Sequence, residues 1–221
     1  MEDDFIRFME YVPYTANNAK VYSPKLIALL LQICGYIDTV FKEMAKFKEF
    51  QNIQECQKIN ALASKDYYGF DITLAQSAFE KIYNLSSNNG AKLVANLEWF
   101  GDKELTPFAT FNSKTKVSPS WWEAHQEVKH FWATTIQKAN MDNTLEALSG
   151  AFLLNAVHYP SIRYLWKLGD LDLVQKTMDG YEIIRIPEGY LDLLLNDAIK
   201  KRKPIAYHHI LDSRLFAYER M

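Results

Sequence analysis

The segment from Pro119 to Pro160 constrains the fold of this chain most, because it combines the densest aromatic run with the clearest helical periodicity. In a helix that begins at Ser120, each residue advances by about 100° around the axis. One arc of that helix then carries only apolar side chains, which are those of Trp121, Ala124, Val128, Phe131 and Trp132. We expect this arc to face a core.

The opposite arc of the same helix holds the candidate functional residues. Glu123, Gln126 and His130 lie there at the i, i+3, i+7 spacing that places side chains on successive turns next to one another. Lys129 precedes His130 directly and completes the candidate set. His125 lies at the edge of the apolar arc. It is five residues from His130, so the two imidazoles diverge on a helix and are not expected to share a metal.

Two threonines and an asparagine follow His130, so we expect the helix to break near Ala133 and to restart at Met141. Asn140 or Asp142 could cap the second helix. Gly150 lies in the middle of that helix, where glycine costs about 1 kcal/mol relative to alanine. Its presence predicts close approach of another element.

The first half of the chain also indicates helices. Ser23 and Pro24 form an N-cap followed by proline at the first helical position, and about 25 helix-compatible residues follow. Their apolar residues form a core-facing stripe: Leu26, Leu29, Leu30, Ile33, Ile37, Val40, Phe41 and Met44. Asp71 or Thr73 could cap a shorter helix that the sequence SSNNG at 86–90 ends. Residues 91–100 are compatible with a strand or a short helix, and periodicity does not decide between them.

The last sixty residues change character. Residues 171–178 and 181–186 flank Asp179 and Gly180, a pair typical of a two-residue β-hairpin turn. A helix is expected from Tyr190 to about Lys201. We therefore predict a mainly α fold, a helical bundle with a small C-terminal β-hairpin appendage. It would form one domain over residues 1–221, with its core at about 23–160 and an extension over 161–221.

Composition narrows the possible functions. The chain has 221 residues and a net charge of −2, so it lacks the basic field of a general nucleic-acid binder. Its two cysteines show no metal-ligand spacing, which favours a reducing compartment such as the cytoplasm. The best apolar run, 26–31, is far shorter than the roughly 18 residues that span a bilayer. We expect no membrane segment.

Several catalytic motifs are missing from the sequence. It contains no glycine-rich phosphate loop, no GxSxG, no HExxH and no cysteine-based metal cluster. His208 and His209 are adjacent and would point in different directions in a helix or a strand, so they make a poor chelating pair. We therefore expect no metal and no cofactor.

Several motifs in the middle of the chain resemble the HEPN superfamily. They are Thr106-Pro107-Phe108, the run Pro119 to Ala124 (PSWWEA), Val128-Lys129-His130 and the run Asn143 to Leu154 (NTLEALSGAFLL). The order of these motifs along the chain is similar to that in an uncharacterised prokaryotic branch of the superfamily, whose members carry a PxWWxAYxxVKH pattern. The resemblance implies an all-α bundle, often a homodimer, in a superfamily linked to RNA cleavage, toxin–antitoxin pairs and phage defence.

Two functions from different classes follow. Active HEPN ribonucleases carry an arginine, four to six arbitrary residues and then a histidine, but the positions at that spacing before His130 hold Glu123, Ala124 and His125. This favours a non-catalytic interaction module that forms a homodimer or binds a protein partner. The alternative is a metal-independent endoribonuclease acting on RNA through His130 with Lys129, or through Arg202 with His208. Arg202 and His208 have the required spacing, although Pro204 interrupts any helix between them.

Overall fold

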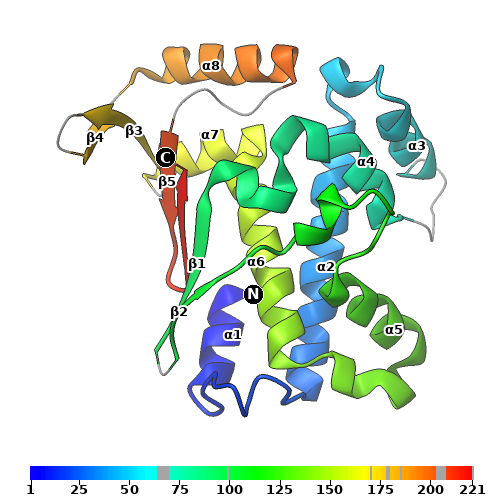
Figure 1. Ribbon diagram of the computed structural model, residues 1–221. Coiled ribbons are helices and arrows are strands. Elements are labelled where there is room, and N and C mark those ends of the chain that lie inside the picture. Colours follow the sequence, from blue (N-terminus) through cyan, green and yellow to red (C-terminus); the bar gives the residue numbers. More distant parts are fainter. Residues whose placement is uncertain are drawn as a thin grey trace.

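The fold is mainly helical, with one antiparallel sheet packed beside the helices (Figure 1). The structure is a computed structural model and describes residues 1–63, 70–98, 100–169, 171–177, 180–184, 186–202 and 208–220. The helices are α1 (Glu2–Met9), α2 (Pro24–Ala45), α3 (Gln54–Ala63), α4 (Ile72–Tyr83), α5 (Ser120–Thr135), α6 (Met141–Val157), α7 (Tyr159–Leu168) and α8 (Glu188–Lys201). The strands are β1 (Lys92–Leu97), β2 (Gly101–Glu104), β3 (Leu171–Thr177), β4 (Gly180–Ile184), β5 (His208–Asp212) and β6 (Phe216–Arg220). Short 3-10 turns lie at Lys48–Phe50, Leu85–Gly90, Ala109–Asn112 and Ile136–Lys138.

Helix α2 is the central helix of the molecule. The Ser23 hydroxyl accepts a hydrogen bond from the backbone N–H of Leu26 at 3.2 Å, which confirms the predicted cap. All eight residues of the predicted apolar stripe are buried. The stripe packs against α6, and the two helices run side by side through the middle of the fold (Figure 1). The predicted apolar stripe on α2 therefore corresponds to the main helix–helix contact.

Helix α6 begins and packs as expected. The Asn140 side chain caps it by accepting a hydrogen bond from the Asn143 N–H at 3.0 Å. A Cβ added to Gly150 would lie 3.3 Å from Cζ of Phe108 and 3.5 Å from Cζ2 of Trp121. The predicted close approach is confirmed, and the groups that approach are aromatic side chains from α5 and from the connector before it.

The sheet has six strands in the order β2-β1-β6-β5-β3-β4, and all neighbouring pairs are antiparallel. The predicted C-terminal hairpin is confirmed, because β3 pairs with β4. The predicted turn pair Asp179-Gly180 was wrong in one position, because Gly180 is the first residue of β4 and pairs with Thr177, while Asp179 lies outside the described residues. It is not an isolated appendage, however. Strand β6 pairs with β1, so residues from the middle and the end of the chain share one sheet. Residues 91–100 thus contain a strand, and Gly101 begins the next one.

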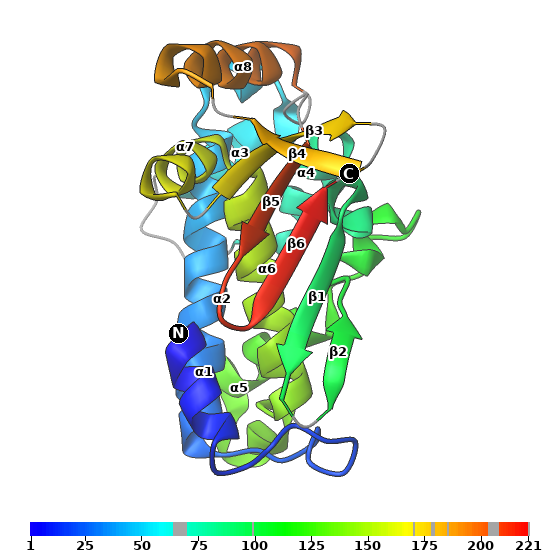
Figure 2. The same cartoon turned by 90° about the vertical axis from the view of Figure 1, so that its left-hand side faces the viewer.

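One face of the sheet belongs to the core. Side chains alternate along the strands as the period of two requires, with Leu173, Phe216 and Tyr218 buried while Asp172 and Glu219 are exposed. Figure 2 shows the sheet lying along one side of α6. The ring centroids of Phe152 on α6 and Phe216 on β6 are 5.2 Å apart. The expected extension over 161–221 therefore contributes to the same buried cluster as the helices.

Among the described helices, α2 is the one long and apolar enough to cross a membrane by length and composition. A core helix of a soluble protein passes the same test. Ten residues of α2 are buried within the fold. The absence of a membrane segment stays a prediction.

Candidate functional site

Helix α5 divides into a buried first half and an exposed end. Trp121 is buried, and its indole N–H donates to the Pro107 carbonyl at 2.7 Å; Ala124 and Val128 are also buried, as expected. The prediction was wrong for Phe131 and Trp132, whose side chains are 65% and 64% exposed. The buried arc therefore ends at Val128, about two turns before the helix does.

A kink at Phe131 explains this difference. Its backbone has φ −135° and ψ 35°, outside the helical region. The hydroxyls of Thr134 and Thr135 both donate to the Phe131 carbonyl, at 3.2 and 2.9 Å. Threonine hydroxyls that bond to a carbonyl of the preceding turn bend helices. The break expected near Ala133 lies two residues earlier, and it turns the last residues of α5 away from the core.

The structure brings together only part of the candidate set. Glu123 is exposed and Gln126 is half-buried, and both line a shallow hollow of about 480 Å³. Its other lining residues are Phe70, Asp71, Ser118, Trp122 and Glu127. Lys129 and His130 are exposed and are not among these residues. In the described part of the chain, no hydrogen bond or ion pair holds the side chains of Glu123, Lys129 or His130.

His125 lies between the core and this exposed face. Its side chain is only 6% exposed, and its ring centroid is 5.0 Å from that of Trp122. Burial lowers the pKa of His125 to about 4, and the nearby charges of Lys129 and His130 act in the same direction. The imidazole is therefore neutral at pH 7. His125 supports the packing of α5 rather than supplying a charge to the exposed face.

The two residues of the alternative pair belong to different elements. Arg202 follows the last residue of α8 in a left-handed conformation, with φ 52°, while His208 is the first residue of β5. Residues 203–207, which include Pro204, lie outside the described residues, as does the side chain of His208. The pairing of Arg202 with His208 stays a prediction. Burial raises the pKa of the Cys56 thiol to about 12, and the charge of Arg202 opposes this rise.

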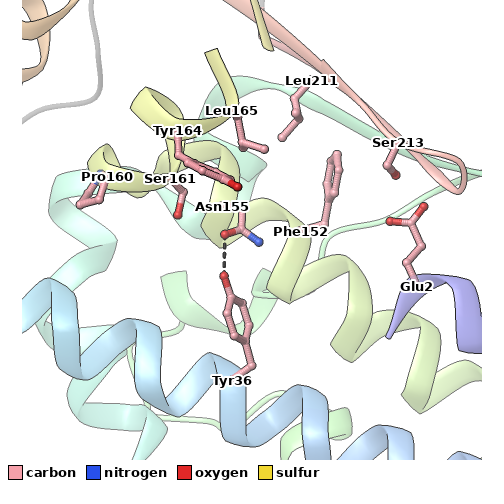
Figure 3. A pocket seen from close by; sticks show the side chains of 10 residues that line it. All are labelled: Glu2, Tyr36, Phe152, Asn155, Pro160, Ser161, Tyr164, Leu165, Leu211 and Ser213. Atoms are coloured by element: carbon pink, nitrogen blue, oxygen red, sulfur yellow. Dashed lines mark hydrogen bonds between the residues drawn. The ribbon is translucent and has the colours of Figure 1, made fainter. Parts of the chain in front are cut away.

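A larger cavity lies elsewhere, between α2, α6, α7 and the sheet (Figure 3). It measures about 670 Å³ and is lined by Glu2, Tyr36, Phe152, Asn155, Pro160, Ser161, Tyr164, Leu165, Leu211 and Ser213. The Tyr36 hydroxyl donates to Oδ1 of Asn155 at 2.6 Å, and Nδ2 of Asn155 donates to the Ala151 carbonyl at 3.1 Å. Burial raises the pKa of Tyr36, although the bond to Asn155 opposes this, so the phenol stays protonated at neutral pH.

A serine and a histidine meet at the edge of this cavity, but their geometry does not match hydrolytic catalysis. Nδ1 of His158 lies 2.8 Å from Oγ of Ser161, at the start of α7. Burial lowers the pKa of His158 to about 4, which leaves a neutral imidazole. In a serine–histidine–aspartate triad the serine faces Nε2, and a carboxylate holds Nδ1. Here the serine occupies the position of that carboxylate, so the pair is a contact at the beginning of a helix.

A partly buried ionic network stabilises the start of α6. Asp142 accepts hydrogen bonds from the Tyr14 hydroxyl, from Lys20 at 3.0 Å and from Lys103 at 3.2 Å. Burial raises the pKa of Asp142, but the bonds from Tyr14 and Lys20 and the charge of Lys103 lower it overall. Burial also raises the pKa of Glu146, one turn along α6. The network joins the N-terminal segment and β2 to α6.

Sequence reasoning missed both the cavity and this network because their residues come from distant segments. Local signals existed for single residues of these two sites: Asn155 shares a helix face with Phe152, and Asp142 was a possible cap.

Within the described residues, no group of three or more histidine, cysteine, aspartate or glutamate side chains could hold a metal ion. Comparison of the chain with protein-family models, with curated proteins and with solved structures found no match.

Proposed function

We propose that this protein is a HEPN-like, non-catalytic interaction module that forms a homodimer through the end of α5. The observation that carries the proposal is the exposure of Phe131 and Trp132, two large adjacent aromatic side chains. Aromatic residues, tryptophan above all, supply a large share of the energy at protein interfaces. The resemblance of the same segment to HEPN proteins supports a dimer and a role in a bacterial defence or toxin–antitoxin setting.

The charges around these aromatic residues favour a second copy as the partner. Lys129 and His130 lie beside Phe131 on an exposed surface, and Glu123 and Glu127 lie one to two turns earlier on the same helix. A two-fold interface applies the same patch to itself, so it requires groups of both signs on one surface. An antiparallel pair of α5 helices would place the acidic turn of one copy against the basic turn of the other.

The test is the oligomeric state of matched variants, measured by sedimentation equilibrium. We expect a wild-type dimer at about 50 µM, and an at least tenfold higher dissociation constant for the double variant Phe131→Ser/Trp132→Ser, since interface hot spots contribute about 2 kcal/mol or more each. The control is Leu193→Ser, which removes an exposed apolar side chain from α8 instead. A wild-type monomer, or a dimer that the double variant leaves unchanged, would contradict the proposed interface.

The absence of catalysis needs its own measurement. Purified protein is incubated with total RNA in the presence of EDTA, and we expect no cleavage because Lys129 and His130 are not among the residues that line the hollow beside Glu123 and Gln126. Reproducible cleavage that disappears in His130→Ala or in His208→Ala would instead establish the metal-independent endoribonuclease.

A further inference from the structure

The cavity between α2, α6, α7 and the sheet has the size and composition of a small-molecule site. Its volume of about 670 Å³ lies within the range of about 300–1,000 Å³ that is common for ligand pockets. Phe152, Tyr164, Leu165 and Leu211 supply apolar and aromatic surface. Such pockets typically combine an apolar lining with a few placed polar groups. Figure 3 shows which side chains supply those groups here, with the amide of Asn155 at the centre.

Asn155 has hydrogen-bonding capacity that the protein does not use. A carboxamide offers two N–H donors and two oxygen lone pairs. The bond to the Ala151 carbonyl uses one donor, and the bond from Tyr36 uses one lone pair. One donor and one acceptor remain on a half-buried side chain that the Tyr36 bond holds in place. The amide edges of heterocyclic bases present the same donor–acceptor pairing, which is why asparagine binds bases in nucleic-acid complexes.

The charge of the lining excludes anionic ligands. Glu2 is the only Asp or Glu among the described lining residues, and no lysine, arginine or histidine is among them. One oxygen of Glu2 already accepts a hydrogen bond from the Leu215 N–H at 2.8 Å. A phosphate group in this cavity would meet a carboxylate and no cation. The ligand should therefore carry no negative charge.

The ring of Tyr164 gives the cavity a flat aromatic surface. Tyr164 belongs to the lining although its side chain is 63% exposed, so its ring lies at the mouth of the cavity. Stacking on an aromatic side chain is available to every base because each has a π-face. We propose that this cavity binds an uncharged nitrogen heterocycle of the nucleobase or nucleoside class. The site is separate from the α5 surface, so the proposal does not depend on the homodimer.

The test uses calorimetric titration of the full chain with adenosine, guanosine, cytidine and uridine, each compared with its 5′-monophosphate. We expect saturable binding of at least one nucleoside at about millimolar concentration or below, and weaker binding of the matching monophosphate. Tyr164→Ala should weaken binding about tenfold through the loss of stacking. Asn155→Leu, which keeps the branched shape of the side chain but removes both polar atoms, should weaken it by at least as much. Tyr11→Ala removes an exposed tyrosine that is not among the lining residues and should change nothing.

Three results would overturn the assignment. The first is that no nucleoside binds up to about 10 mM. The second is that binding persists unchanged in both Tyr164→Ala and Asn155→Leu, which would place it elsewhere. The third is that a monophosphate binds more tightly than its nucleoside, which the charge of the lining forbids. Because Tyr164 is largely exposed, its variant tests the site even if Asn155→Leu fails to fold.

Discussion

At the scale of single residues, the buried His125 and the half-buried His158 make the stability of the fold depend on pH. Burial lowers the pKa of both His125 and His158 to about 4. The pKa of an unfolded histidine is about 6.5. Below pH 6.5 the unfolded chain therefore binds protons that the folded chain does not bind until about pH 4. Their contribution to stability is present above pH 6.5 and is lost as the pH falls towards 4.

This gives a prediction for His125, whose side chain is nearly inaccessible to solvent. A pKa lowered from 6.5 to about 4 corresponds to a loss of up to about 3 kcal/mol in the free energy of unfolding between pH 7 and pH 4. We expect His125→Gln to reduce the pH dependence by a comparable amount, whatever it does to stability at pH 7. Urea denaturation at pH 7.0 and pH 4.5 measures it. His130→Gln, which replaces an exposed imidazole on the same helix, serves as the control. An equal change in the free energy of unfolding between the two pH values for wild type and His125→Gln would contradict the assignment.

At the scale of elements, the helices followed from local signals and the sheet did not. The caps at Ser23 and Asn140 and the stripe on α2 each involve residues within a few positions, so the sequence predicted them correctly. The pairing of β1 with β6 joins segments more than a hundred residues apart, and no local pattern encodes it. The end of α5 was misjudged for another reason, because two threonine hydroxyls compete for a helical carbonyl and turn Phe131 outward.

The candidate site likewise has residues that local sequence signals predicted and residues that they did not. The sequence placed Glu123 and Gln126 on one face correctly, since both line the same hollow. It could not place Tyr36 beside Asn155, because that contact depends on how α2 packs against α6. Helix packing is therefore the step at which sequence reasoning stopped.

Substitutions at two glycines, Gly35 on α2 and Gly150 on α6, test how tightly these helices pack. Gly150 on α6 faces Phe108 and Trp121, whereas an added Cβ at Gly35 on α2 would have no atom within 4 Å. Gly150→Val is expected to destabilise the protein by about 2 kcal/mol, since overpacking a filled core costs about 1–3 kcal/mol. Gly35→Ala is expected to stabilise it by up to about 1 kcal/mol, the difference in helix propensity. Thermal and chemical denaturation measure both changes, and a stabilising Gly150→Val would show that α6 is free to move.

At the scale of the whole molecule, helices and sheet share one core, so they should unfold together. Phe216 on β6 is buried and packs against Phe152 on α6. Removing a buried phenylalanine side chain typically costs about 3–5 kcal/mol. We expect Phe216→Ala to lose about 3 kcal/mol and to keep one transition, seen alike by far-ultraviolet circular dichroism and by tryptophan fluorescence. Separate transitions for the two probes would mean that the sheet and the helices are independent units.

The sheet order also has a consequence for how the protein is made. Strand β6 lies between β1 and β5, yet it follows every other strand in the chain. Ribosomes add about 5–20 residues per second, so β1 waits on the order of ten seconds for its neighbour. During that interval the β1–β2 hairpin presents a strand edge with unpaired backbone groups, together with the apolar side chains of Leu93 and Ala95. Such edges pair readily with other chains, so we expect the nascent protein to be most prone to aggregation in the time between the synthesis of β1 and that of β6.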